Sequence, residues 1–129
     1  MGDPNDIRRT VLLVDDEQDV RQIAAAILSE LGFHVIEAID AQTAMAIIRG
    51  PAPVDLLMTD LAMPRIGGLE LAHLAREVRP GLKVLYTSAY VRAAETNAAL
   101  RYGPFIEKPW RLEQLRAVLE KLIGPAKPI

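Results

Sequence analysis

The sequence contains no cysteine among its 129 residues. Disulfides, thiolate zinc sites and cysteine nucleophiles are therefore excluded, and nothing indicates an oxidising compartment. Long hydrophobic runs are absent too, since no stretch approaches the roughly 18 apolar residues of a membrane span. The first ten residues, MGDPNDIRRT, have neither the apolar region of a signal peptide nor the myristoylation pattern, because Asp6 stands where Ser or Thr is needed. We expect a cytoplasmic protein that neither spans a membrane nor is anchored to one.

An excess of positive charge is also missing. The formal net charge is -2, and the Lys and Arg residues are scattered among acidic ones. A protein that binds a phosphate backbone normally gathers its positive charge on one face. The sequence therefore predicts no direct binding of nucleic acid.

What the sequence does contain is a regular alternation of strand-like and helix-like segments. Short apolar runs at 10–15, 33–38, 54–60, 83–88 and 105–108 predict strands. Helical patterns follow them at 20–31, 41–49, 71–78, 92–102 and 112–122. The core-facing stripes expected on the first, third and fifth helices are Val20, Ile23, Ala24, Ile27, Leu28 and Leu31, then Leu71, Leu74, Ala75 and Val78, then Leu112, Leu115, Val118, Leu119 and Leu122.

Alternating strands and helices of this length predict one α/β domain. Crossover helices connect parallel strands, and near-continuous apolar strands indicate that both faces of the sheet are covered. We expect a doubly wound α/β sandwich over residues 10–123, with a flexible N-terminal segment at 1–9 and a short tail at 124–129. Sheets of this kind bind ligands beyond the carboxyl ends of their strands.

Charged and polar residues stand at those strand ends. They are Asp15 and Asp16 after the first strand, Asp60 at the third, Ser88 at the fourth and Lys108 at the fifth. Carboxylate oxygens suit a hard cation such as Mg²⁺. Beside such a cation, a carboxylate can attack phosphorus and become an aspartyl phosphate, while a lysine and a hydroxyl neutralise the transferring oxygens. Glu37 and Asp40 end the second strand, which we place at the sheet edge, and they are left out of the site.

Each of these residues also has a simpler interpretation. Asp15 and Asp16, read alone, are more often a helix N-cap and its neighbour. Asp60 alone could merely end a strand, and Lys108 alone could be a solvated surface residue. Thr87 would supply the hydroxyl in place of Ser88 if the strand register slipped by one residue. The convergence of all these side chains on one rim favours the functional interpretation.

Four segments in order, LLVDDE, DLLMTDLAMPRIGGLEL, VLYTSAY and FIEKPWRLEQL, resemble the receiver domains of bacterial response regulators, the partners of histidine kinases in two-component signalling. The resemblance covers most of the chain, from Thr10 to Ile123. It implies a flavodoxin-like (βα)5 sandwich whose five-stranded parallel sheet has the order 2-1-3-4-5.

The resemblance also implies a role for each site residue. Asp60 would be the phosphoacceptor, and Mg²⁺ would be held by Asp15, Asp16, Asp60 and the backbone carbonyl of Ala62. Ser88 would bond the phosphoryl group, Lys108 would pair with it, and Phe105 would be the aromatic switch that moves inward with Ser88. The Lys108–Pro109 bond corresponds to the family's cis peptide, which an X-Pro amide adopts at modest cost.

The implied function is a receiver that takes a phosphoryl group from a phosphohistidine on a histidine kinase or a histidine phosphotransfer protein. It would then switch conformation to control contact with a downstream protein, as a monomer or a phosphorylation-dependent dimer. We expect self-catalysed phosphoryl transfer and autodephosphorylation rather than an enzyme acting on other substrates.

Two other functions remain as alternatives. A Mg²⁺-dependent phosphohydrolase also uses an aspartyl nucleophile, but the residues after Asp60 are LAM and lack the second aspartate that would act as acid and base. A phosphorylation-independent interaction module would not need Asp15, Asp16, Asp60, Ser88 and Lys108, all of which are present.

Overall fold

The central sheet is parallel and has the strand order β2-β1-β3-β4-β5, as predicted. The computed structural model describes residues 8–88 and 98–126. Within them the elements are β1 (Thr10–Val14), α1 (Gln18–Glu30), β2 (His34–Ala38), α2 (Ala41–Arg49), β3 (Leu56–Asp60), α3 (Gly68–Val78), β4 (Lys83–Ser88), β5 (Phe105–Glu107) and α5 (Leu112–Ile123).

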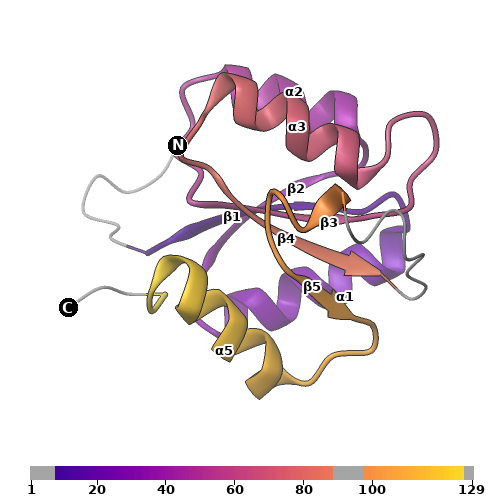
Figure 1. Cartoon of the computed structure of the whole chain (residues 1–129). Helices are drawn as coiled ribbons and strands as arrows, with labels where there is room; N and C mark the ends of the chain where they lie inside the picture. Colours follow the sequence, from indigo (N-terminus) through magenta and orange to yellow (C-terminus); the bar gives the residue numbers. More distant parts are fainter. Residues whose placement is uncertain (1–7, 89–97, 127–129) are drawn as a thin grey trace.

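The helices form two layers around this sheet. Helices α2 and α3 cover one face, and α1 and α5 cover the other (Figure 1). The fold is therefore the doubly wound sandwich that the alternation of elements predicts, with the flavodoxin-like strand order that the family resemblance implies. The helix expected over residues 92–102 falls partly on residues 89–97, outside the described part of the chain. Residues 98–103 form a closing helical turn, in which the Tyr102 amide donates to the Ala99 carbonyl (2.9 Å).

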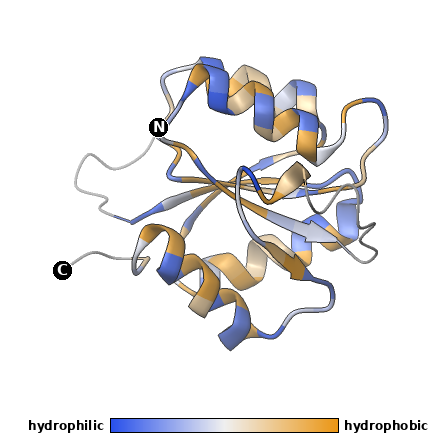
Figure 2. Ribbon diagram, viewed as in Figure 1, coloured by the Kyte–Doolittle hydropathy of each residue, from blue (hydrophilic) through white to orange (hydrophobic). Residues whose placement is uncertain are grey.

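Each face of the sheet has its own apolar cluster, because successive residues of a strand point to opposite faces. Leu12 and Val14 of β1 pack on the side of α2 and α3, whereas Val11 and Leu13 pack on the side of α1 and α5. Each fully buried side chain of this size stabilises the fold by roughly 1.5–3 kcal/mol. The helices carry hydrophobic and hydrophilic residues in alternating bands, as helices with one face on a sheet do (Figure 2).

Three residues of the predicted helical stripes do not reach the core. Ile23 of α1 is 62% exposed, and Val78 and Leu112 are exposed as well. Ile23 lies on the flank of its stripe, about 100° around the helix from buried Ala24. Val78 and Leu112 are the last residue of α3 and the first of α5. The prediction was therefore wrong at one flank and at two helix ends, where periodicity continues but the sheet does not lie beneath.

The end of α1 agrees with the sequence. Gly32 follows the helix with φ of +99°, a left-handed conformation that glycine adopts without steric cost. Its amide donates to the Ser29 carbonyl (3.0 Å) and the next amide, of Phe33, donates to the Leu28 carbonyl (3.1 Å), so the last turn is closed. Within residues 8–88 and 98–126, no helix is both long and apolar enough to cross a membrane.

Candidate functional site

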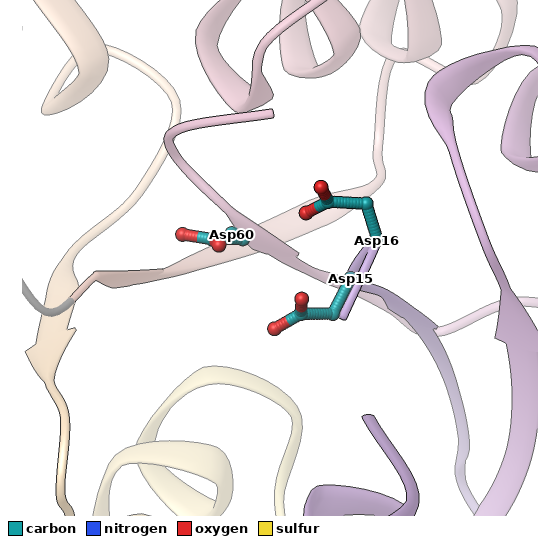
Figure 3. A group of neighbouring side chains, drawn as sticks. All are labelled: Asp15, Asp16 and Asp60. Atoms are coloured by element: carbon teal, nitrogen blue, oxygen red, sulfur yellow. The ribbon is translucent and has the colours of Figure 1, made fainter. Parts of the chain in front are cut away.

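Three carboxylates meet where β1 and β3 end. Asp15 and Asp16 project from the chain just past β1, and Asp60 projects from the last position of β3 (Figure 3). One oxygen from each lies within 4.8 Å of the others. Because β1 and β3 are adjacent parallel strands, their carboxyl ends share one rim, and residues far apart in sequence come together there.

Asp60 is buried, with 8% of its surface exposed. Its Oδ2 lies 3.5 Å from the Lys108 ammonium, and its Oδ1 accepts a weak hydrogen bond from the Ala62 amide (3.4 Å). Burial raises the pKa of the Asp60 carboxyl above its usual value, and the Asp15 carboxylate raises it further. Lys108 and the Ala62 amide act on this pKa in the opposite direction without cancelling the rise.

Asp15 is also buried, and both of its carboxylate oxygens have partners. Oδ1 accepts from the Glu17 amide (2.9 Å), and Oδ2 pairs with the Lys108 ammonium (3.1 Å). Lys108 therefore bridges Asp15 and Asp60, as the convergence of strand ends predicts. Asp16 is exposed and is not the helix cap, because α1 has Glu17 at its N-cap position and no side-chain cap.

Ser88 is buried at the end of β4, and its carbonyl accepts a hydrogen bond from the Lys108 amide (3.0 Å). The strand register pairs Asp60 with Thr87, so Ser88 lies one residue further along the rim. Phe105 is half-buried at the start of β5, and its ring centroid lies 5.1 Å from that of Tyr86. The Lys108–Pro109 peptide bond is cis.

The donor set fits a hard divalent cation. Among the residues that the structure describes, three carboxylates face one ammonium, so the cluster carries an excess of negative charge. The Lys108 ammonium does not offset the rise in the pKa of Asp60 that burial causes. Mg²⁺ takes oxygen ligands and commonly uses one or two carboxylates. Asp15, Asp16 and Asp60 are therefore the residues that could hold it.

The residues set aside at the end of β2 do not join this cluster. Asp40 caps α2, where its side chain accepts from the Thr43 amide (2.7 Å) and its pKa is lowered by that bond. Glu37 pairs with Arg21 (3.2 Å). Arg21 in turn donates to the Asp15 carbonyl (2.9 Å), a contact that the sequence pattern does not indicate.

Glycine at the start of α3 allows the helix to approach the backbone of Asp60 closely. A Cβ at Gly68 would lie 2.3 Å from the Asp60 carbonyl oxygen, and the Gly68 amide donates to the Leu61 carbonyl (2.8 Å). Read from the sequence, the Gly-Gly pair shapes a turn into a helix. The structure adds that Gly68 is held against the backbone of Asp60 itself.

Comparisons with known proteins agree with this geometry. Residues 11–120 match the family model for the response regulator receiver domain. The chain is 30% identical over 117 residues to the response regulator receiver protein CpdR of Brucella abortus, an alignment that covers 89% of this chain and 97% of that protein. It is 34% identical to the response regulator MprA of Mycobacterium avium, covering 92% of this chain but only 52% of MprA.

A solved structure shows the same architecture. The response regulator TrrA of Thermotoga maritima, in complex with Mg(2+)-BeF, superposes with a TM-score of 0.79 at 26% identity, over 88% of this chain and 98% of that one. The family model spans most of the chain, and the observed strand order is the one that the sequence resemblance implies. The chain therefore belongs to the response regulator receiver domains of two-component signalling.

Proposed function

We propose that this receiver domain accepts a phosphoryl group on Asp60 from a phosphohistidine of a histidine kinase or histidine phosphotransfer protein, with Mg²⁺ bound at Asp15, Asp16, Asp60 and the Ala62 carbonyl. The observation that carries the proposal is the position of Asp60. Its carboxylate is buried at a strand end, within 4.8 Å of two other carboxylates and 3.5 Å from an ammonium. A carboxylate that served only to end a strand would not need these surroundings.

The chemistry assigned to the chain's residues is a simple displacement. An ionised Asp60 oxygen attacks phosphorus, the O–P bond forms, the P–N bond to the donor imidazole breaks, and the imidazole leaves with its electron pair and takes up a proton. Lys108, already within 3.5 Å of Asp60, neutralises negative charge on the transferred group. The Ser88 hydroxyl donates a hydrogen bond to a phosphoryl oxygen. When bound, Mg²⁺ would neutralise further charge on the phosphoryl oxygens.

The solved relative supports the choice of cation. TrrA of Thermotoga maritima is a complex with Mg(2+)-BeF, and it shares the fold over 88% of this chain. The donor chemistry of the carboxylate cluster points to the same kind of ion.

The output that we propose is a shift between two conformations. The aspartyl phosphate favours one of them through Ser88, Lys108 and the half-buried Phe105, and this changes contact with a downstream protein. Phosphorylation either leaves the protein a monomer or induces a dimer. We propose a cytoplasmic signalling protein that catalyses only its own phosphorylation and dephosphorylation.

Intact mass measurement after incubation with Mg²⁺ and acetyl phosphate tests the proposal. One added phosphate in the wild type and none in Asp60→Asn supports it. Asp19→Asn, which changes an exposed acidic residue in the first turn of α1, is the matched control and should be phosphorylated like the wild type. Continuous turnover of a phosphate ester would instead indicate a phosphohydrolase. The absence of any adduct, with acetyl phosphate and with kinase, would indicate a phosphorylation-independent module.

A further inference from the structure

The main chain of the acidic pair is held by an arginine from α1. Arg21 Nη1 donates to the carbonyl of Asp15 (2.9 Å), and Arg21 Nε donates to the Glu37 carboxylate (3.2 Å). Only 11% of the Arg21 side chain is exposed. A nearly buried guanidinium must be paired and hydrogen-bonded to offset its lost hydration, and these two acceptors on different elements provide that.

The segment that Arg21 holds has left the sheet. The last ladder contact on this side is the Asp15 amide donating to the Ala38 carbonyl (3.3 Å), and α1 begins only at Gln18. Glu17 caps α1 without a side-chain bond. The turn that carries Asp15 and Asp16 is held by the bond between the Asp15 carboxylate and the Glu17 amide, by the pairing of that carboxylate with Lys108, and by the contact of the Asp15 carbonyl with Arg21. Among these contacts, Arg21 alone holds the Asp15 main chain.

Glu37 fixes the orientation of the guanidinium. It comes from β2, the strand next to β1, and it accepts from Nε while Nη1 reaches the Asp15 carbonyl. The guanidinium of arginine suits this arrangement, because its N–H donors lie in one plane at fixed angles to one another. A lysine at position 21 would keep the charge but offers a single nitrogen, so it could not hold both acceptors in the same way.

We propose that Arg21 is a positioning residue for the Mg²⁺ site, holding the main chain of Asp15 so that the carboxylates of Asp15 and Asp16 face Asp60, with Glu37 orienting its guanidinium. The inference rests on the proposed function, because it concerns the same cation site. Arg21 acts through the acidic pair and does not touch the ion.

The two roles that Arg21 could have, adding positive charge and positioning the acidic pair, predict opposite effects of its removal on Mg²⁺ binding. If Arg21 merely added a positive charge near the site, its removal would strengthen Mg²⁺ binding, since a cation repels a cation. If Arg21 positions the acidic pair, its removal weakens Mg²⁺ binding, as loss of an outer-shell partner does for other metal sites.

The experiment measures the Mg²⁺ dissociation constant by calorimetry for the purified protein and four variants. Arg21→Gln should raise the dissociation constant by about tenfold, and Arg21→Lys should also raise it although the charge is kept. Glu37→Ala should weaken binding, whereas Glu37→Gln, which keeps an oxygen acceptor for Nε, should bind nearly as well as the wild type. In the metal-free protein, hydrogen exchange of the Glu17 amide should be faster in Arg21→Gln.

A matched control separates this role from general stability. Arg76→Gln removes another partly buried arginine, one that donates to the carbonyls of Leu82 and Tyr102, and should leave the Mg²⁺ dissociation constant unchanged. In one outcome, the wild type binds Mg²⁺ and is phosphorylated on Asp60 while Arg21→Gln binds Mg²⁺ equally or more tightly. That result overturns the inference about Arg21 and leaves the proposed function intact. A wild type that neither binds Mg²⁺ nor accepts phosphate overturns the proposed function, and the inference with it.

Discussion

At Asp60, burial opposes ionisation of the carboxyl and raises its pKa. Its carboxylate is buried beside the Asp15 carboxylate, and these effects on its pKa outweigh the pairing with Lys108. A carboxylate in such surroundings opposes folding while it is ionised. The same excess of negative charge is what makes the rim suitable for a cation and for a phosphoryl group brought in with it.

At the residue scale we expect Asp60→Asn to stabilise the protein at neutral pH without Mg²⁺. Because the pKa of Asp60 is raised in the folded protein, the folded state binds the proton more tightly than the unfolded chain does. The folding penalty is therefore absent below the ordinary pKa of 3.8 and is complete once the pH has risen through the folded pKa. The increase in the free energy of unfolding should exceed the scatter of about 0.5 kcal/mol seen for surface substitutions.

Urea unfolding of both proteins across this pH range measures the difference. The free energy of unfolding should be higher for Asp60→Asn at neutral pH, and the two proteins should converge as the pH falls and wild-type Asp60 becomes protonated. Asp19→Asn, the matched control, should show no gain in the free energy of unfolding at neutral pH. If Asp60→Asn is less stable at neutral pH, the pairing with Lys108 outweighs burial, and the pKa of Asp60 is lowered rather than raised.

At the scale of elements, the start of α3 fixes the end of β3. Gly68 lets the helix lie so close to the strand that an added Cβ would meet the Asp60 carbonyl oxygen at 2.3 Å. The main-chain atoms on both sides of this contact belong to regular elements, Gly68 to α3 and Asp60 to β3. A side chain added at Gly68 would therefore have to shift the helix or the strand. The position of Asp60 is therefore linked to how α3 begins.

We expect Gly68→Ala to destabilise the protein by about 1–3 kcal/mol, the usual cost of overpacking, and to slow phosphorylation of Asp60 by acetyl phosphate. Gly81→Ala is the matched control, because nothing lies within 4 Å of a Cβ added there. Chemical unfolding and intact mass against time measure the two effects. Equal behaviour of the two variants would show that α3 adjusts without moving Asp60.

At the scale of the whole molecule, a cation bound at the acidic cluster would link two strand ends that only folding brings together. The acidic cluster joins the end of β1 to the end of β3, and an unfolded chain does not hold Asp15 and Asp60 together. A ligand that binds only the folded state stabilises it by RT ln(1 + [L]/Kd), about 2.7 kcal/mol at a hundred times Kd.

We therefore expect Mg²⁺ to raise the melting temperature of the wild type, and Asp15→Asn to lose most of this increase while folding normally. Asparagine keeps an oxygen that can accept from the Glu17 amide, so that turn is preserved while the charge and the pairing with Lys108 are lost. Thermal unfolding with Mg²⁺ and with a chelator measures the effect. An Asp15→Asn protein that does not fold would show that Asp15 is chiefly a structural residue.

The sequence alone determined the alternation of elements, the parallel sheet and the residues at the strand ends. These depend on local periodicity and on the rule that parallel strands end at one rim, so Asp15, Asp16, Asp60 and Lys108 could be grouped before their distances were known. Local patterns were enough to predict the helices and strands, because each of them needs only its own apolar face and its own start and stop signals.

Only the tertiary structure decided how those elements meet. Packing left Ile23 exposed and brought Gly68 against the Asp60 carbonyl. It also made Glu17 rather than Asp16 the N-cap of α1 and placed Arg21 between Glu37 and Asp15. Such contacts depend on the distance and rotation between neighbouring elements, which the combined packing of both sheet faces sets and no single stretch of sequence encodes.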